Sequence, residues 1–454
     1  MARTIALTSE KTPAVGSVTR EQQRLLRTWM SGLNALTDAR SPTQTAAFLG
    51  RPLLLQLLRG TLPPRVEAFQ RGYLRGILAS MGHEHLAPAD LRVSGWVEEE
   101  LRPRLTAGQL PSPEQMAFLL DRIFSSPEEE RWEGTFELGC LLGLLWRLIH
   151  LPGNTLASVE ALSVLAAKIK SLDAQRPVRL NPGARVVDLC GSGKRRIQLP
   201  SISTTASILA AYLARERGLP VVVSKSCSGG TSRPTGSADS LEVLLGRPVA
   251  TSIQENQSLS ARLGLSFWRC EQYMPRFAHW YHGTTFAPTA LSVCAPAVLA
   301  SPVERQRIIY GLTAGPIEVC ARVLSRLYPE AEVLVVSGRS ADGAPLLDEV
   351  SPWGSTEWVS ARAGILEQGS WSFEQVGLSR SPLYEAGAIP LQQFLSGDAP
   401  SDFQDMASIE AALILGDGDL RNLDAQQVAQ VRATLGTPGL QAFIAEMRAA
   451  TLAA

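Results

Sequence analysis

Several features that would place a protein in a class at once are absent from this chain of 454 residues. Lys and Arg together number 43, as do Asp and Glu, so the chain lacks the overall basic charge that favours nucleic-acid binding. Any anion-binding site must therefore be local, and we expect no nucleic-acid partner. The six cysteines include no Cys-x-x-Cys pair, and most lie in apolar stretches, which is typical of reduced, buried thiols in a cytoplasmic protein.

Long apolar runs are also absent. The N-terminal sequence MARTIALTSEK has no apolar signal core, and the most apolar segment, residues 138–151, is interrupted by Arg147. That segment is too short to cross a bilayer. We therefore expect a cytoplasmic protein that does not associate with membranes.

Helical periodicity dominates the first part of the chain. In residues 21–105 apolar residues recur at spacings of three and four, without a chemical motif. A new helix is predicted at Ser112, which suits the N-cap, with Pro113 at the first helical position and Gln115 completing a capping box. Two more apolar helical segments follow, so residues 112–173 are predicted to form a small helical domain.

Three short β-branched runs follow, with the sequences ARVVDLC, LPVVVSK and AEVLVVSG. Segments with helical periodicity separate them, and this alternation predicts a largely parallel sheet with crossover helices. The last part of the chain returns to helical patterns. The sequence thus predicts an α/β fold preceded by helices.

The first chemical patch follows the first predicted strand. Gly191, Ser192 and Gly193 come before three cations, and a hydroxyl-rich stretch then begins a helix, whose unpaired amides favour an anion. The patch is not a Walker A loop, because Lys194 is followed by Arg195 rather than by Ser or Thr. The alternative is a glycine turn with solvated cations.

The second and third patches follow the other two strands. Lys225 to Gly246 again brings glycines and hydroxyl residues to the end of a strand, and parallel strands place such loops at one edge of the sheet. The third patch holds the adjacent carboxylates of Asp348 and Glu349. Next to a phosphate site they suggest Mg²⁺, whereas in isolation such a pair is more often an exposed turn.

In this order the three patches resemble the family of anthranilate phosphoribosyltransferase and the pyrimidine nucleoside phosphorylases, glycosyltransferase family 3. The family's first loop reads GTGGD and its next segment ends in NIST, where this chain has GSGKR and SIST at the same spacing. The second loop of the family, KHGNRxxSSxxGSAD, is similar to KSCSGGTSRPTGSAD here. The transferase's Asp-Glu pair is similar to Asp348-Glu349.

The resemblance implies an α/β fold class of the nucleoside phosphorylase/phosphoribosyltransferase type. A small all-helical domain would accompany a larger α/β domain with a mainly parallel central sheet, and an extra helical segment would precede both. Residues 1–110 would form the N-terminal helical extension, and 111–178 the helical domain, joined by part of 265–300. Residues 179–454 would form the phosphoribosyl-binding domain with a helical C-terminus, and the family suggests a homodimer.

The resemblance also implies how the site works. Phosphoribosyl pyrophosphate would be the donor, with fixed cations and Mg²⁺ stabilising the pyrophosphate that leaves, so no protein nucleophile is needed. The residues expected at the donor are Gly191, Ser192, Gly193, Lys194, Arg195, Ser201, Ser203, Thr204, Lys225, Ser228, Ser232, Arg233 and Ser237. The expected metal ligands are Ser203, Asp348 and Glu349.

The sequence departs from the family at informative positions. Lys194-Arg195 stand where relatives have Gly-Asp, and Ser201 replaces the Asn of NIST. The stretch HGTTFAPTALSVCAPAVLASP lies where the family has an arginine segment that binds the anthranilate carboxylate. We therefore expect an acceptor other than anthranilate.

The aromatic segment 267–286 is the candidate acceptor wall. A flat heterocycle could stack on its rings while a histidine accepts the proton. The alternative is a pair of helices that pack these rings into the core or a dimer interface. The expected acceptor residues are Trp268, Tyr273, Trp280 and Tyr281, with His279 or His282 as the proton acceptor.

The leading prediction is a Mg²⁺-dependent transferase that moves phosphoribose to a nitrogen, or less readily a carbon, of a small aromatic or heterocyclic acceptor. A nucleoside or nucleotide phosphorylase is the second candidate, which would not need the Asp-Glu pair. The third is a non-catalytic relative that binds nucleic acid or a protein through Lys194, Arg195, Arg196 and the N-terminal helices.

Overall fold

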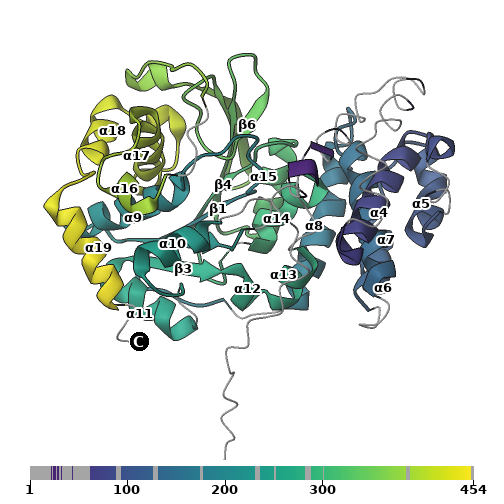
Figure 1. Ribbon diagram of the computed structural model, residues 1–454, viewed down its shortest axis with the longest axis horizontal. Helices are drawn as coiled ribbons and strands as arrows, with labels where there is room; N and C mark the ends of the chain where they lie inside the picture. Colours follow the sequence, from purple (N-terminus) through teal and green to yellow (C-terminus); the bar gives the residue numbers. More distant parts are fainter. Residues whose placement is uncertain are drawn as a thin grey trace, which may run out of the picture.

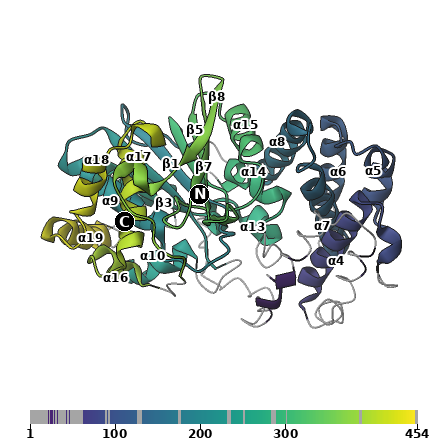
Figure 2. The same ribbon diagram turned by 90° about the horizontal axis from the view of Figure 1, so that it is seen from above.

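A computed structural model defines the architecture (Figures 1 and 2). It describes residues 62–450 apart from the gaps 88–90, 92–93, 126–130, 174–176, 231–235, 250–251, 282–287, 300 and 385–388, together with scattered residues between 22 and 46.

The centre of the molecule is one eight-stranded sheet with the order β3-β2-β1-β4-β5-β7-β8, in which β6 also pairs with β5. Strands β1 to β5 are parallel, and β6, β7 and β8 are antiparallel additions. The mainly parallel sheet predicted from the sequence is therefore confirmed. The strands are β1 Arg185–Gly191, β2 Val221–Cys227, β3 Leu265–Arg269, β4 Arg307–Gly311, β5 Glu332–Arg339, β6 Pro345–Leu347, β7 Thr356–Arg362 and β8 Ile365–Trp371.

The strand order places a topological switch point in the middle of the sheet. From β1 the chain proceeds through β2 to β3 on one side, and it then returns to continue through β4 to β5 on the other. The loops that leave β1 and β4 consequently diverge and open a crevice at the carboxyl ends of these strands. In open α/β sheets this is where ligands bind.

Helices cover both faces of the sheet (Figure 1). Alternate residues of one strand serve opposite faces: Val186 packs with the helical half of the molecule, whereas Val187 packs with the C-terminal half. One face carries α14 Ala290–Leu299 and α15 Ile317–Leu327, with α8 Thr155–Leu172 behind them; the other carries α9 Ile202–Glu216, α10 Ser237–Leu245, α11 Ile253–Leu263, α16 Leu391–Leu395, α17 Ser401–Leu415, α18 Ala425–Arg432 and α19 Pro438–Ala450.

The helical end of the molecule lies to one side of the sheet, opposite the C-terminal helices (Figure 2). It contains α4 Pro64–Ser80, α5 Trp96–Thr106, α6 Pro113–Ser125 and α7 Arg131–Leu148. The predicted capping box of α6 is confirmed, since Ser112 and Gln115 each accept the other's backbone amide at 3.3 Å. None of the helices in the described part of the chain is long and apolar enough to cross a membrane.

Glycines bring α4 and α7 into backbone contact. Gly72 and Gly76 on α4 face Gly139 and Gly143 on α7, and a Cβ atom at any of them would lie 1.9–2.4 Å from a carbonyl oxygen of the other helix. Only glycine permits such an approach. Helices from residues 1–110 and from 111–178 therefore share one core, although the boundary predicted between them stays a prediction.

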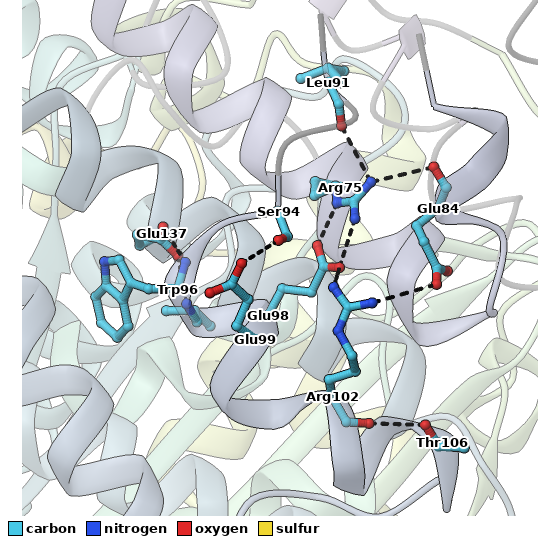
Figure 3. Close-up of polar contacts among 11 residues, drawn as sticks. Arg75, Glu84, Leu91, Ser94, Trp96, Glu98, Glu99, Arg102, Thr106 and Glu137 are labelled. Atoms are coloured by element: carbon cyan, nitrogen blue, oxygen red, sulfur yellow. Dashed lines mark hydrogen bonds and ion pairs between the residues drawn. The ribbon is translucent and has the colours of Figure 1, made fainter. Parts of the chain in front are cut away.

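Buried charges fix α5 against this pair (Figure 3). Arg75 of α4 donates to both carboxylate oxygens of Glu98 on α5, and the two side chains are only 3% and 1% exposed. Glu137 of α7 accepts the first amides of α5, from Trp96 and Val97, at 3.0 Å each. A carboxylate at a helix N-terminus satisfies orphan donors and opposes the helix dipole.

The glycine contact gives a stability prediction. Gly143→Ala would place its Cβ atom 2.4 Å from the Tyr73 carbonyl oxygen, so α4 and α7 must separate. We expect a loss of about 1–3 kcal/mol in the free energy of unfolding, measured by chemical denaturation.

The matched control is Gly439→Ala in α19, where the nearest atom is the flexible end of Tyr212 at 2.4 Å. This variant should unfold close to the wild type. An equal loss in both variants would contradict close backbone contact between α4 and α7.

Candidate active site

A cavity of about 420 Å³ opens at the carboxyl ends of β1, β2 and β4. It joins the three patches that lie far apart in the sequence. The predicted site residues that line it are Gly191, Gly193, Arg195, Ser201, Ser203, Thr204, Lys225, Ser228, Ser237, Tyr273, Asp348 and Glu349.

Asp348 holds the first loop in place. One of its carboxylate oxygens accepts from the Ser192 hydroxyl at 2.5 Å, and the other accepts from the Gly193 amide at 2.7 Å. The first oxygen also accepts from the amide and the hydroxyl of Thr313, which follows β4, at 2.7 and 2.5 Å. One buried carboxylate thus ties together the loops on both sides of the switch point.

Close backbone packing explains why β4 ends in a glycine. A Cβ atom at Gly311 would lie 1.8 Å from the Asp348 carbonyl oxygen, so β4 must end in glycine for the Asp348 segment to cross it. The Gly311 carbonyl also accepts the Ser192 amide at 2.8 Å. The same glycine therefore permits the close approach of Asp348 and holds the first loop through its carbonyl group.

The first turn of α9 faces the cavity through Ser203 and Thr204. The amides of a helix's first turn have no partner within the helix, and they favour an anion. The Thr204 side chain is fully buried, and its hydroxyl makes no hydrogen bond with any described residue. Its hydroxyl is therefore available to donate a hydrogen bond to a polar ligand in the cavity.

Two carboxylates hold the second loop in place on the opposite side of the cavity. Asp239 accepts the amides of Gly230 and Gly236 at 2.8 and 2.6 Å, and Glu271 accepts the amide of Gly229 at 2.8 Å. Lys225 is only 3% exposed, and its ammonium group donates to the Ser226 carbonyl at 2.7 Å. A buried cation and the start of α10 at Ser237 therefore face the first loop across the cavity.

An ion pair lies at the wall of the cavity. Arg195 Nη1 lies 2.9 Å from Glu349 Oε1, and Glu410 of α17 lines the same wall. Burial raises the pKa of the Glu410 carboxyl well above its usual range, and the Glu349 charge raises that pKa further, against the lowering effect of Lys225 and Arg195. Glu410 therefore retains its proton at pH values where an exposed glutamate has lost it.

Three thiols also line the cavity, those of Cys190, Cys227 and Cys270. Burial raises the pKa of Cys190 and of Cys227 to about 12, although the Lys225 charge opposes the rise. A thiol with such a pKa is not a nucleophile near neutral pH. The six cysteines are free, as expected from the sequence.

The structure separates the predicted acceptor residues. Tyr273 lines the cavity and shares a hydrogen bond of 2.9 Å with the Ser226 hydroxyl. Trp268 is buried in the helical-side core with its indole donating to Ser266, and the Trp280 ring packs edge-on against Phe124. Neither tryptophan lines the cavity, and their packing is that of the alternative interpretation; of the predicted acceptor residues whose side chains are described, Tyr273 is the one that lines the cavity.

The other predicted residues fall into two groups. Ser192 and Lys194 are buried behind the loop rather than among the residues that line the cavity. Ser192 therefore shapes the loop through Asp348. Ser232, Arg233 and His282 lie outside the described residues, as do the side chains of His279 and Tyr281.

Sequence reasoning missed three residues of this region. Thr313 follows the short run RIIYG of β4, whose strand-then-glycine pattern matches that of the first two patches and could have been recognised. Glu410 lies within an apolar helix, and no motif marks it. Arg24 lines the cavity from the N-terminal segment, next to the fully buried Leu26.

The carboxylates do not fit a metal ion held by the protein alone. Both oxygens of Asp348 accept hydrogen bonds from loop residues, and an oxygen of Glu349 faces the Arg195 guanidinium. The described residues contain no group of three or more His, Cys, Asp or Glu side chains suited to a metal. The metal role predicted for Ser203, Asp348 and Glu349 stays a prediction.

The comparison with known families now decides the class. The model of the glycosyl transferase family, a/b domain, matches residues 183–437, which is more than half of the chain. This chain belongs to that family. The expected enzyme class, a pentosyltransferase similar to anthranilate phosphoribosyltransferase, is thereby confirmed.

Curated relatives of this glycosyl transferase are named anthranilate phosphoribosyltransferase. That of Exiguobacterium sibiricum is 29% identical over 229 residues, which span 50% of this chain and 62% of the relative. That of Pelodictyon phaeoclathratiforme is 25% identical over 338 residues, which span 70% of this chain and 85% of the relative.

Solved structures share the fold. The enzyme of Thermus thermophilus superposes with a TM-score of 0.57 at 21% identity, covering 76% of this chain and 97% of its own. The Saccharomyces cerevisiae enzyme, solved in complex with PRPP and Mg, gives 0.52 at 16% identity and covers 75% of this chain and 93% of its own. Another structure of the Saccharomyces cerevisiae enzyme, in complex with 4-fluoroanthranilate, covers 85% of this chain with a TM-score of 0.54 at 15% identity.

The protonated state of Glu410 gives a prediction on pH. Above the ordinary value near 4.5 the unfolded chain releases the Glu410 proton, whereas the folded protein retains it because its pKa is raised. Stability must therefore fall as the pH rises through this window, by up to about 1.4 kcal/mol per pH unit.

Glu410→Gln should remove this slope and stabilise the protein at neutral pH, as measured by denaturant titrations between pH 5 and 8. The exposed Glu216→Gln, at the end of α9, is the control and should keep the wild-type profile. Parallel profiles for wild type and Glu410→Gln would contradict a buried, protonated carboxyl.

Proposed function

We propose that this enzyme transfers phosphoribose from phosphoribosyl pyrophosphate to a nitrogen of an aromatic or heterocyclic acceptor and releases pyrophosphate. The observation that carries the proposal is the Thr204 hydroxyl, buried and without a hydrogen-bond partner among the described residues, at a helix start that faces the cavity. The curated relatives named as transferases of this kind support the same donor.

The donor's diphosphate is proposed to bind at the first turn of α9, with Thr204 and Ser203 donating to its oxygens. Lys225 and Ser237 on the facing wall would meet the phosphoribosyl part. Mg²⁺ is proposed to enter as part of the substrate, chelated by the diphosphate, as a cation that prefers phosphate oxygens and water does. Fixed donors and cations then stabilise the leaving charge.

No covalent intermediate on the protein is required. The acceptor nitrogen forms its bond to C1 of the ribose as the bond from C1 to the diphosphate breaks. The leaving group carries away the electron pair, and the nitrogen releases its proton to water. The raised pKa values of Cys190 and Cys227 agree with this, because those thiols hold their protons. The rate enhancement would come from positioning and electrostatic stabilisation.

The acceptor is proposed to lie beside Tyr273, the predicted acceptor residue that lines the cavity. The relatives are named for anthranilate, whereas the sequence predicts another acceptor because the expected arginine segment is missing. Part of that stretch, 282–287, lies outside the described residues, so the exclusion of anthranilate stays a prediction. Homodimer formation and a cytoplasmic location also stay predictions.

Calorimetric titration with phosphoribosyl pyrophosphate tests the proposal. Binding should require Mg²⁺, and Thr204→Val should weaken it by about 10-fold or more, because a hydrogen bond to a charged group is lost. Ser207→Ala, one turn along α9, is the matched control: its hydroxyl donates to the Ser203 carbonyl, and it should leave donor affinity unchanged.

No binding at millimolar donor would overturn the proposal. Tight binding of inorganic phosphate with a nucleoside would instead indicate a phosphorylase, and salt-sensitive binding of an oligonucleotide would indicate a non-catalytic relative. Release of pyrophosphate on adding anthranilate would overturn the predicted exclusion of that acceptor alone.

A further inference from the structure

An arginine of the chain contacts one of the carboxylates that line the cavity. Arg195 Nη1 lies 2.9 Å from Glu349 Oε1 and 3.2 Å from the Pro200 carbonyl oxygen. The Arg195 and Glu349 side chains are only 16% and 7% exposed. These two contacts hold the guanidinium inside a partly desolvated site.

Three carboxyl groups surround this position and need compensation. Asp348, Glu349 and Glu410 all line the cavity and are at most 8% exposed. A buried carboxylate is stable only when hydrogen bonds or a cation offset the loss of hydration. Asp348 is satisfied by loop donors, whereas an oxygen of Glu349 lies against the Arg195 guanidinium, so Glu349 is the carboxylate that is compensated by a cation.

A divalent ion or a fixed cation can meet that requirement, and the two exclude one another at short range. A metal on Glu349 would place two further positive charges beside a guanidinium that cannot release its proton. Arg195 follows directly on the loop that Asp348 holds, so the hydrogen bonds of Asp348 also help to position the guanidinium.

We propose that Arg195 supplies, as a built-in cation, the positive charge that this carboxylate cluster would otherwise take from a divalent metal ion. The free protein then holds no metal at Glu349. The same guanidinium faces the cavity in which the diphosphate is proposed to lie, and planar guanidinium groups bind phosphate oxygens well. Only this last step rests on the proposed function; the exclusion of metal does not.

The test measures binding of Mn²⁺ to the protein in the absence of any donor. The electron paramagnetic resonance signal of free Mn²⁺ reports how much of the ion is unbound. Wild type should not bind Mn²⁺ at submillimolar concentration. Arg195→Met removes the charge at similar length and should create a site for one Mn²⁺ per chain, at least 10-fold tighter than in wild type. Adding Glu349→Gln to Arg195→Met should abolish the new site.

Two controls separate this role from a change in folding. Arg195→Lys keeps a cation and should still exclude Mn²⁺, whereas Arg196→Met removes the neighbouring, exposed cation and should behave as wild type. Thermal unfolding of Arg195→Met with and without Mn²⁺ gives a second readout, and the metal should raise its Tm.

Two results would overturn the proposal. One is a stoichiometric Mn²⁺ site in wild type that disappears in Glu349→Gln. The other is a folded Arg195→Met protein that gains no Mn²⁺ binding. Since no donor is present, these results are independent of whether the chain transfers phosphoribose.

Discussion

The site depends on one buried carboxylate. Asp348 is 6% exposed and accepts hydrogen bonds from Ser192, Gly193 and Thr313, so it joins the loops that diverge at the switch point of the sheet. A carboxylate with several charge-assisted donors is strongly held. Its position fixes the glycine loop and, through that loop, Arg195. The side chain that the sequence marks as a metal ligand thus organises the cavity by hydrogen bonding.

The cavity combines fixed charges with an unsatisfied hydroxyl. Arg195 lies against Glu349, and Lys225 lines the facing wall. On our proposal the free site therefore needs no external ion. A donor that carries its own Mg²⁺ can then enter without first displacing a metal from the protein. The contribution of Arg24 to the cavity wall also links the N-terminal segment, which lies outside residues 183–437 matched by the family, to the site.

The sequence predicts the strands and loops that carry this site well, and the side chains that line the cavity less well. The runs of β1, β2 and β5 are apolar and bounded by clear turns, so the parallel sheet and the two loops follow from pattern alone. Strand β3 is hidden within an aromatic stretch. The tryptophans of that stretch looked like a stacking surface, but whether a ring lines a cavity or the core depends on tertiary packing. Glu410 comes from a distant helix and carries no local signal.

The most direct test of the account is a crystal structure of the protein with phosphoribosyl pyrophosphate and Mg²⁺. We expect the diphosphate at the first turn of α9, within hydrogen-bonding distance of the Thr204 hydroxyl, and Mg²⁺ bound by the donor's oxygens rather than by Glu349. A diphosphate bound elsewhere, or a metal ion coordinated by Asp348 and Glu349 with Arg195 displaced, would contradict it.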